Sequence, residues 1–138
     1  MSRPDFDLIL AGGGLANGFI AHRLAERRPD LKVLVLEGGA AIGGNHTWSF
    51  HDGDLSPAEH DWVAPFVAHR WADYEVRFPR RKRRVGTGYA SVSSERFREV
   101  LTASLGPRLR LGTPIQTLTP TEVTLADGTA ISARAVID

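Results

Sequence analysis

The chain has 138 residues, enough for one domain, and a formal net charge of only +1, because 17 lysines and arginines face 16 aspartates and glutamates. This balance argues against a partner that is held mainly by electrostatic attraction. The absence of cysteine excludes disulfides and thiolate metal sites, and no run of residues reads as a membrane span or a signal peptide.

The stretch from Phe6 to Glu37 has the order strand, glycine turn, helix, strand and acid that is typical of a dinucleotide-binding unit. Residues 8–10 form the first apolar run, and apolar residues at helical spacing predict a helix from about Gly14 to Arg28. A uniformly apolar second run, 33–36, predicts a parallel strand that is covered on both faces. The alternative is a glycine-rich turn in an ordinary α/β domain.

The glycines and the acid have separate roles in this interpretation. Gly12 permits a tight turn out of the first strand, and Gly14 lacks a Cβ, so a pyrophosphate can approach the backbone. The helix that begins near Gly14 offers free N–H groups and the positive end of its dipole. Glu37 can accept hydrogen bonds from ribose hydroxyls. The cofactor-binding residues predicted in this unit are Gly12, Gly13, Gly14, Leu15, Ala16, Asn17 and Glu37.

One position departs from the G-x-G-x-x-G pattern, because its last place holds Asn17 and the glycine follows at Gly18. The third glycine normally allows the helix to pack closely on the strand. We therefore expect either a slightly wider fit or a hydrogen bond from Asn17 to the glycine turn.

Four glycines fall within residues 38–44, and the chain then becomes dense in hydrogen-bonding and aromatic side chains up to His51. Glycine permits close backbone approach to a ligand, so we predict that this segment runs along the cofactor. The alternative is a flexible loop followed by a short strand. Gly43, Gly44 and Asn45 join the predicted cofactor-binding residues. No metal site is predicted, because the five histidines form no ligand set at helical spacing.

Two further helices are predicted from their ends. A capping box at 56–59 begins one helix, which Pro65 should end or bend. Ser93 or Ser94 caps the other, and Gly106 with the following proline stops it. The buried stripe predicted for the second helix comprises Phe97, Val100, Leu101 and Leu105.

Residues 74–78 alternate with period two and predict a strand with one buried face. Pro79 and five consecutive basic residues, 80–84, follow, and a second extended run lies near Val85. The basic run is either a nucleic-acid patch or the solvated tip of a hairpin. We favour the tip, since the overall charge is nearly balanced and no aromatic residue interrupts the run. Attraction to anionic lipid headgroups is a third option.

From Leu109 onward the chain reads as short strands alone. They are expected at 109–111, 115–118, 123–125 and 130–131, with a final strand at 135–137 and a hairpin turn at Asp127-Gly128. An NAD domain would repeat the strand–helix pattern, whereas flavoproteins of the glutathione-reductase type cross over by such a meander. The sequence therefore predicts FAD and an α/β, Rossmann-like FAD-binding domain of the glutathione-reductase type with a β-meander crossover, incomplete at the C-terminus.

The spacing from Glu37 to Gly43 and Gly44 also resembles the E-x5-GG pattern of many flavin amine oxidases and desaturases. More specifically, the whole chain resembles the flavin-dependent carotenoid cyclases, the lycopene cyclase family. The resemblance is carried by residues 7–18, 43–51, 74–79, 93–97 and 136–138. Asn17 is the residue that this family shows at the departing position.

The resemblance implies an enzyme that converts the linear ends of lycopene into β-rings, giving β-carotene through γ-carotene. The reaction is an isomerisation by an intramolecular lyase with no net redox change, yet it requires reduced FAD, with NAD(P)H as the reductant. The acid is expected beyond Asp138, so no catalytic residue is named. His46, Trp48 and His51 are candidates for the substrate cavity.

The resemblance also implies that residues 1–138 are the N-terminal part of an FAD/NAD(P)-binding domain without the substrate domain, and inactive alone. Because lycopene dissolves in the bilayer, we expect a cytoplasmic protein, peripheral to the inner face of the membrane, with no nucleic-acid partner. Two other functions stay open. They are an FAD-dependent oxidoreductase of the hydroxylase or desaturase type, and a non-catalytic nucleotide-binding module.

Overall fold

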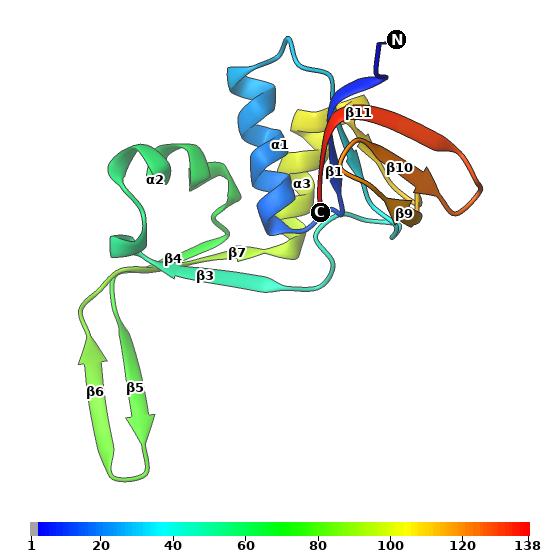
Figure 1. Cartoon of the computed structure of the whole chain (residues 1–138). Coiled ribbons are helices and arrows are strands. Elements are labelled where there is room, and N and C mark those ends of the chain that lie inside the picture. Colours follow the sequence, from blue (N-terminus) through cyan, green and yellow to red (C-terminus); the bar gives the residue numbers. More distant parts are fainter. Residues whose placement is uncertain (1–2) are drawn as a thin grey trace. The chain divides into compact units, whose positions relative to one another are not determined.

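The computed structural model describes residues 3–138, which divide into two compact units (Figure 1). The first unit comprises the chain up to Gly44 together with Leu101–Asp138, and the second comprises Asn45–Val100. No helix within residues 3–138 combines the length and the apolar character that a membrane crossing requires.

The first unit is built on a six-stranded sheet in the order β8-β2-β1-β11-β10-β9. At its centre β1 (Phe6–Ala11) pairs in parallel with β2 (Val33–Leu36) on one side and with β11 (Ala130–Ile137) on the other. β8 (Leu109–Arg110) extends the parallel part beyond β2. All four residues of β2 are buried, as predicted for a parallel strand covered on both faces.

The other half of this sheet is an antiparallel meander of β9 (Ile115–Leu118), β10 (Glu122–Leu125) and β11. The predicted turn at Asp127-Gly128 is confirmed, since Gly128 has a φ of +87° and closes the connection between β10 and β11. The prediction of separate strands at 130–131 and 135–137 is wrong, because β11 is one continuous strand of eight residues.

The continuity of β11 has a physical cause in its two neighbours. Its first half pairs with β10 and its second half pairs with β1, so the residues between them are held extended by both. Ser132 stands at this change of partner, and its N–H and hydroxyl both donate to the Asp5 carboxylate, at 3.0 and 2.8 Å.

Two helices have the predicted extent to within a residue or two. α1 (Leu15–Arg27) follows Gly14 directly, and α3 (Ser94–Leu105) is capped by Ser93, whose Oγ accepts from Arg96 N at 3.2 Å. Of the predicted stripe on α3, Phe97, Leu101 and Leu105 are buried and Val100 is half-buried. One buried cluster in the core of the first unit comprises Ile9, Leu34, Leu36, Val123, Leu125, Ile131 and Ala133.

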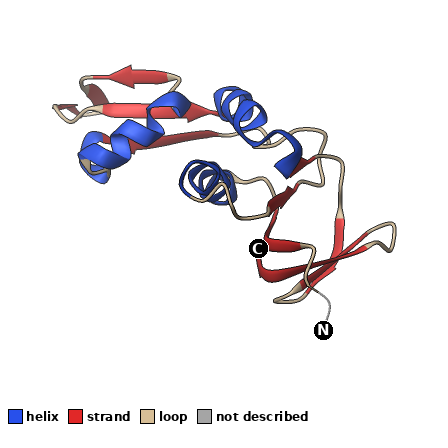
Figure 2. Ribbon diagram, turned by 90° about the horizontal axis from the view of Figure 1, so that it is seen from above, coloured by secondary structure: helices blue, strands red, loops and turns tan. Residues whose placement is uncertain are grey.

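The second unit contains a three-stranded antiparallel sheet in the order β3-β7-β4. Its strands are β3 (Thr47–His51), β7 (Tyr89–Ser93) and β4 (His69–Trp71). α2 (Pro57–Val63) lies next to this sheet (Figure 2). The contact includes the rings of Phe50 and His60, whose centroids are 6.0 Å apart.

The capping box that begins α2 is confirmed. Ser56 Oγ accepts from Glu59 N at 3.3 Å, and the Glu59 carboxylate accepts from Ser56 N at 2.7 Å. Pro65 lies in a short 3-10 turn that follows the helix, so it bends the chain as predicted. The 3-10 turns of the chain span Asp52–Asp54, Ala64–Phe66 and Gly106–Arg108.

The second unit also contains a two-stranded sheet of β5 (Tyr74–Phe78) and β6 (Arg81–Val85) (Figure 1). The basic run was expected at the tip of this hairpin, but most of it forms β6, and the turn consists of Pro79 and Arg80. The predicted burial of one face of β5 is also wrong, since Phe78 is 65% exposed. No third strand pairs with β5 or β6 among the described residues, which leaves the outer edges of both strands unpaired.

Candidate functional site

The glycine turn leaves β1 through Gly12, which has a φ of +97° and donates its N–H to the Leu36 carbonyl at 2.8 Å. The next residue, Gly13, is enclosed by the protein itself. A Cβ at Gly13 would lie 2.5 Å from Ile42 Cγ1 and 2.8 Å from Glu37 Oε2. Gly13 is therefore required by packing within the chain.

Gly14 differs from Gly13, since a Cβ built on it meets no atom within 4 Å. Its φ of −77° and ψ of 178° are an extended conformation that any residue adopts. Among the described residues nothing demands glycine here, so space for a ligand close to the backbone explains it best.

Gly14 is also the N-cap of α1 and supplies no side-chain cap, and the first turn contains no acidic residue within the described chain. The first N–H groups of a helix lack partners inside the helix and attract an anion. The backbone of Leu15 and Ala16 is thus suited to a phosphate, and their contact with a cofactor stays a prediction.

Asn17 forms the hydrogen bonds that its departure from the glycine pattern led us to expect. The side chain is buried, and its Nδ2 donates to the carbonyls of Ala11 and Gly12, at 3.0 and 3.1 Å. These two bonds fix the chain on both sides of the turn. Asn17 is therefore a support of the glycine turn.

Glu37 follows β2 and joins two glycine segments through its carboxylate. Oε2 accepts from Gly13 N and Oε1 accepts from Gly39 N, each at 2.8 Å. Its backbone is fixed as well, because Glu37 N donates to the Arg110 carbonyl and Thr113 N donates to the Glu37 carbonyl, both at 2.9 Å. A carboxylate has four acceptor positions, so two remain for hydroxyl donors such as those of a ribose.

The segment after Glu37 folds back onto the glycine turn. Gly43 N donates to the Gly13 carbonyl at 3.0 Å, and the side chain of Ile42 is fully buried. Gly43 and Gly44 both have positive φ, of +86° and +58°, which explains the glycines by backbone conformation. Asn45 is exposed. The prediction that Gly43, Gly44 and Asn45 contact a cofactor stays a prediction.

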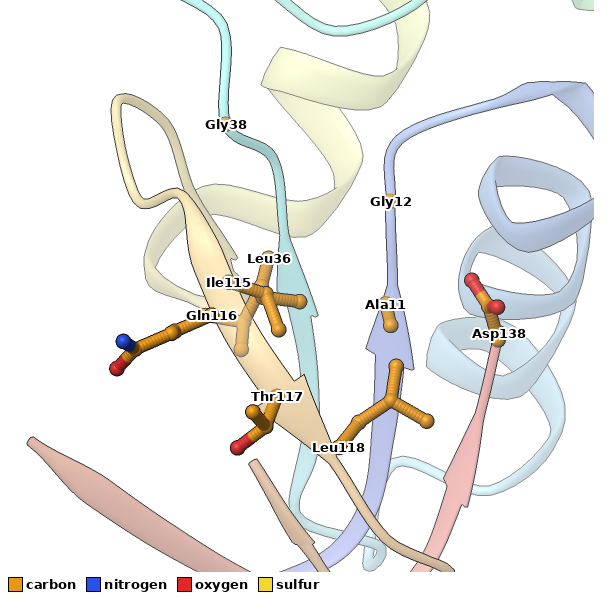
Figure 3. Close-up of a pocket in the computed structure, with 9 residues that line it drawn as sticks. All are labelled: Ala11, Gly12, Leu36, Gly38, Ile115, Gln116, Thr117, Leu118 and Asp138. Carbon is orange, nitrogen blue, oxygen red and sulfur yellow. The ribbon is translucent and has the colours of Figure 1, made fainter. Parts of the chain in front are cut away.

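A cavity of about 400 Å³ opens at the carboxyl ends of β1 and β2 (Figure 3). In open α/β sheets, ligands bind outside the carboxyl ends of the strands. Asp138 lies at the end of β11 beside the end of β1, so the last strand reaches the same cavity. The cavity is lined by Ala11, Gly12, Leu36, Gly38, Ile115, Gln116, Thr117, Leu118 and Asp138.

The sequence did not predict the contribution of β9 to this cavity. Residues 115–118 come to the cavity through their pairing with β10, which in turn pairs with β11. Gly38, which the sequence singled out only as part of a glycine-rich segment, lies against Pro114, whose Cα would be 3.5 Å from an added Cβ. No spacing in the sequence signals these contacts.

The three candidates for the substrate cavity lie in the second unit and do not all come together. The rings of His46 and Trp48 are 5.6 Å apart, and Trp48 also packs on Phe97 at 5.1 Å. His51 is an odd number of positions from Trp48 along β3 and so faces the other side. There its Nε2 lies 3.0 Å from the Tyr74 hydroxyl.

The carboxylates near β3 are engaged in structural contacts. Asp52 accepts from Arg70 at 2.9 Å, and Asp54 accepts from His51 N at 2.7 Å. The hydrogen bonds from the backbone and the hydroxyl of Ser56 lower the pKa of Glu59 from its ordinary value. That the catalytic acid lies beyond Asp138 stays a prediction. No group of three or more metal-ligating side chains lies within residues 3–138. That the protein binds no metal stays a prediction.

A family model described as "Lycopene cyclase protein" matches residues 7–138. The chain is 54% identical over 132 residues to a lycopene beta-cyclase of Pseudescherichia vulneris and 48% identical over 136 residues to one of Pantoea ananas. These matches cover 96% and 99% of this chain but only 34% and 36% of the relatives, so the chain spans about a third of their length.

Among solved structures, the fold is similar to that of aklavinone-11 hydroxylase in a ternary complex with FAD and aklavinone. The TM-score is 0.66 at 18% sequence identity, and the match covers 99% of this chain and 33% of the hydroxylase. At this identity the likeness shows the mixed α/β fold alone.

Proposed function

Because the chain belongs to the lycopene cyclase family, we propose that the complete protein converts the linear ends of lycopene into β-rings, giving β-carotene by way of γ-carotene. The observation that carries this proposal is the family match along residues 7–138. The product has the same atoms as the substrate, so the reaction is an isomerisation by an intramolecular lyase.

The proposed cofactor is FAD, held by a domain of the glutathione-reductase type. Gly14 leaves open space beside the first N–H groups of α1, which suits a pyrophosphate. The Glu37 carboxylate, oriented by Gly13 and Gly39, has acceptor positions left for ribose hydroxyls. The cavity of about 400 Å³ is lined by Gly12 of the glycine turn and by Leu36 and Gly38, which flank Glu37 in the sequence, and it is large enough for part of an adenosine.

Cyclisation begins when an acid protonates a terminal alkene, after which the ring closes on the carbocation and a proton is lost. Reduced FAD, with NAD(P)H as the reductant, would supply negative charge that stabilises this cation in a dry cavity. The part played by residues 1–138 is to hold that group in a fixed place. The acid and the substrate domain are proposed to lie in the two thirds of the protein that the relatives have in addition.

His46, Trp48 and His51 remain proposed neighbours of the substrate, in two separate places. Trp48 presents an aromatic ring next to His46, and aromatic faces attract cations. His51 lies across β3 with Tyr74 and Tyr89, whose ring is 5.2 Å away. We further propose that the protein is cytoplasmic and peripheral to the inner face of the membrane, where its hydrocarbon substrate is dissolved.

The test is to express the complete protein in cells that accumulate lycopene and to analyse the carotenoids. Formation of β-carotene, with γ-carotene as the intermediate, is expected, and residues 1–138 alone should give neither. Unchanged lycopene with the complete protein contradicts the proposal. A product with a net redox change, or NAD(P)H consumed in proportion to product, would assign the protein to the hydroxylase or desaturase type.

A further inference from the structure

The hairpin of β5 and β6 has two chemically different faces. Residues that lie directly opposite each other in an antiparallel pair point to the same side of the sheet. The register therefore assigns Tyr74, Val76, Phe78, Arg81, Arg83 and Val85 to one side, called here the apolar–basic face. It assigns Glu75, Arg77, Lys82 and Arg84 to the other, the ion-paired face.

Each cation of the ion-paired face lies against a neighbouring carboxylate. Glu75 pairs with Arg77 and with Lys82, whose Nζ lies 3.1 Å from Glu75 Oε2. Arg84 forms a two-point contact with Asp73, at 2.8 and 2.9 Å. Each basic residue on this side thus has a carboxylate partner.

The apolar–basic face has apolar side chains and cations without acids. Phe78 is 65% exposed at the end of β5, beside Pro79 in the turn. Arg81 and Arg83 form no ion pair among the described residues, and neither does Arg80 in the turn. Three basic side chains of the ion-paired face share the two carboxylates of Glu75 and Asp73, whereas Arg80, Arg81 and Arg83 have no carboxylate partner among the described residues.

We propose that the apolar–basic face docks on an anionic lipid bilayer. Apolar side chains that enter the boundary between headgroups and acyl chains, flanked by arginines that meet phosphates, are the two features of an interfacial contact. Phe78 with Val76 supplies the first, and the three arginines supply the second. This proposal rests on the proposed function, which requires access to a substrate in the bilayer. Its test measures lipid binding and not cyclisation, so failure of membrane docking is distinguishable from failure of the proposed cyclase activity.

The composition of the face favours lipid over nucleic acid. Binding to single-stranded nucleic acid uses successive aromatic rings on which bases stack. Here aliphatic Val76 separates the aromatic residues Tyr74 and Phe78 and lies opposite Arg83, and aliphatic side chains gain from acyl chains but not from stacked bases. The rest of the complete protein is the other candidate to cover the apolar–basic face, so the experiments must distinguish it from lipid.

The first experiment measures flotation of the complete, FAD-loaded protein with vesicles of phosphatidylcholine, with and without phosphatidylglycerol. Each arginine near an anionic surface changes the partition about fivefold, so Arg80→Gln/Arg81→Gln/Arg83→Gln should weaken binding to the anionic vesicles about 100-fold. The matched control, Arg77→Gln/Lys82→Gln/Arg84→Gln, removes the same charge from the ion-paired face and should lose less than about tenfold. Equal losses in the two variants, or equal binding to both vesicle types, would overturn the proposal.

The second experiment attaches an environment-sensitive dye at Phe78→Cys in a complete protein without other cysteines. Residues 1–138 contain none, which makes the site unique within them. The emission should move to the blue only when anionic vesicles are added. A blue emission before lipid addition would show that the rest of the protein covers the face, and an unchanged emission with vesicles would show no insertion.

A third measurement tests binding of the complete protein to an oligonucleotide. Oligonucleotide binding that depends on Arg80, Arg81 and Arg83, with no vesicle binding, would assign a nucleic-acid partner. Each of these three outcomes overturns the proposal.

Discussion

The two units differ in how completely their strands are paired and their apolar side chains are buried. In the first unit the central strand is paired on both sides, and core residues such as Ile9 and Leu34 are almost fully buried. In the second unit the β5–β6 sheet has only two strands, and Trp71 and Phe78 are 46% and 65% exposed. Two-stranded sheets are marginal in water by themselves. The first unit thus covers its central strand on both sides, whereas the β5–β6 sheet of the second unit keeps an apolar ring at its surface.

The same contrast exists on a smaller scale inside the glycine turn. Gly13 is enclosed by Ile42 and Glu37, whereas Gly14 faces open space. One glycine therefore serves the fold and the next is available to a ligand, although the two are adjacent in the sequence. Substitutions in and around this turn separate folding from binding.

The largest effect is expected for Gly13→Val. Its Cβ would overlap Ile42 Cγ1 and Glu37 Oε2, and its bulk would separate Gly13 N from the carboxylate. Overpacking and a lost charged hydrogen bond together cost about 3 kcal/mol or more. Thermal unfolding of the complete protein should move to clearly lower temperature, and the flavin should be lost with the fold. A stable protein of normal melting temperature would show that the enclosure of Gly13 is not real.

The next effect is expected for Asn17→Ala, which removes both hydrogen bonds to the Ala11 and Gly12 carbonyls. Leaving these acceptors without partners costs about 2 kcal/mol. Flavin should still bind but dissociate faster, because the turn is less fixed. The measurement is the denaturant midpoint together with flavin release, and an unchanged value of both would contradict a supporting role for Asn17.

A smaller effect, confined to the second unit, is expected for Ser56→Ala. The variant removes the cap of α2 and should cost about 1 kcal/mol. Flavin content should not change, because the glycine turn belongs to the first unit. Hydrogen exchange should report faster opening of α2 alone. Loss of flavin in this variant would mean that the two units do not have the separate roles assigned to them.

The smallest effect is a pH dependence that arises from His22 on α1. Burial lowers the pKa of His22, while Glu26 opposes this shift and Arg23 adds to it. The unfolded chain then takes up the proton more readily than the folded one, so the free energy of unfolding is constant above about pH 6.5 and falls below it. Chemical unfolding at about pH 7.5 and 5.5 should show this decrease in the natural protein and less of it in His22→Gln. Equal decreases would contradict the assignment.

What the sequence predicted well depends on residues close together in the chain. The capping box of Ser56 and Glu59, the turn at Gly128 and the start of α1 after Gly14 each follow from a few neighbouring positions. The hydrogen bond from Asn17 to the turn was anticipated for the same reason, since donor and acceptors lie within six positions.

What the sequence missed depends on partners far away or absent. The continuity of β11 results from β1 and β10 together, and the enclosure of Gly13 results from Ile42. For β5, period-two alternation correctly predicted a strand but wrongly predicted that one of its faces is buried. Alternation tells which residues share a face and not what covers that face. Phe78 shows this most clearly, with its ring exposed.

The most direct test of the central claim, that the open side of the glycine turn holds FAD, is the flavin content of the complete Gly14→Val protein. Its backbone conformation suits valine and no protein atom stands within 4 Å of the new Cβ, so the fold should lose at most about 1 kcal/mol through the weaker cap. The account predicts a folded protein, with a melting profile like that of the natural protein stripped of flavin, that purifies without FAD. A folded Gly14→Val protein with normal flavin content would contradict it.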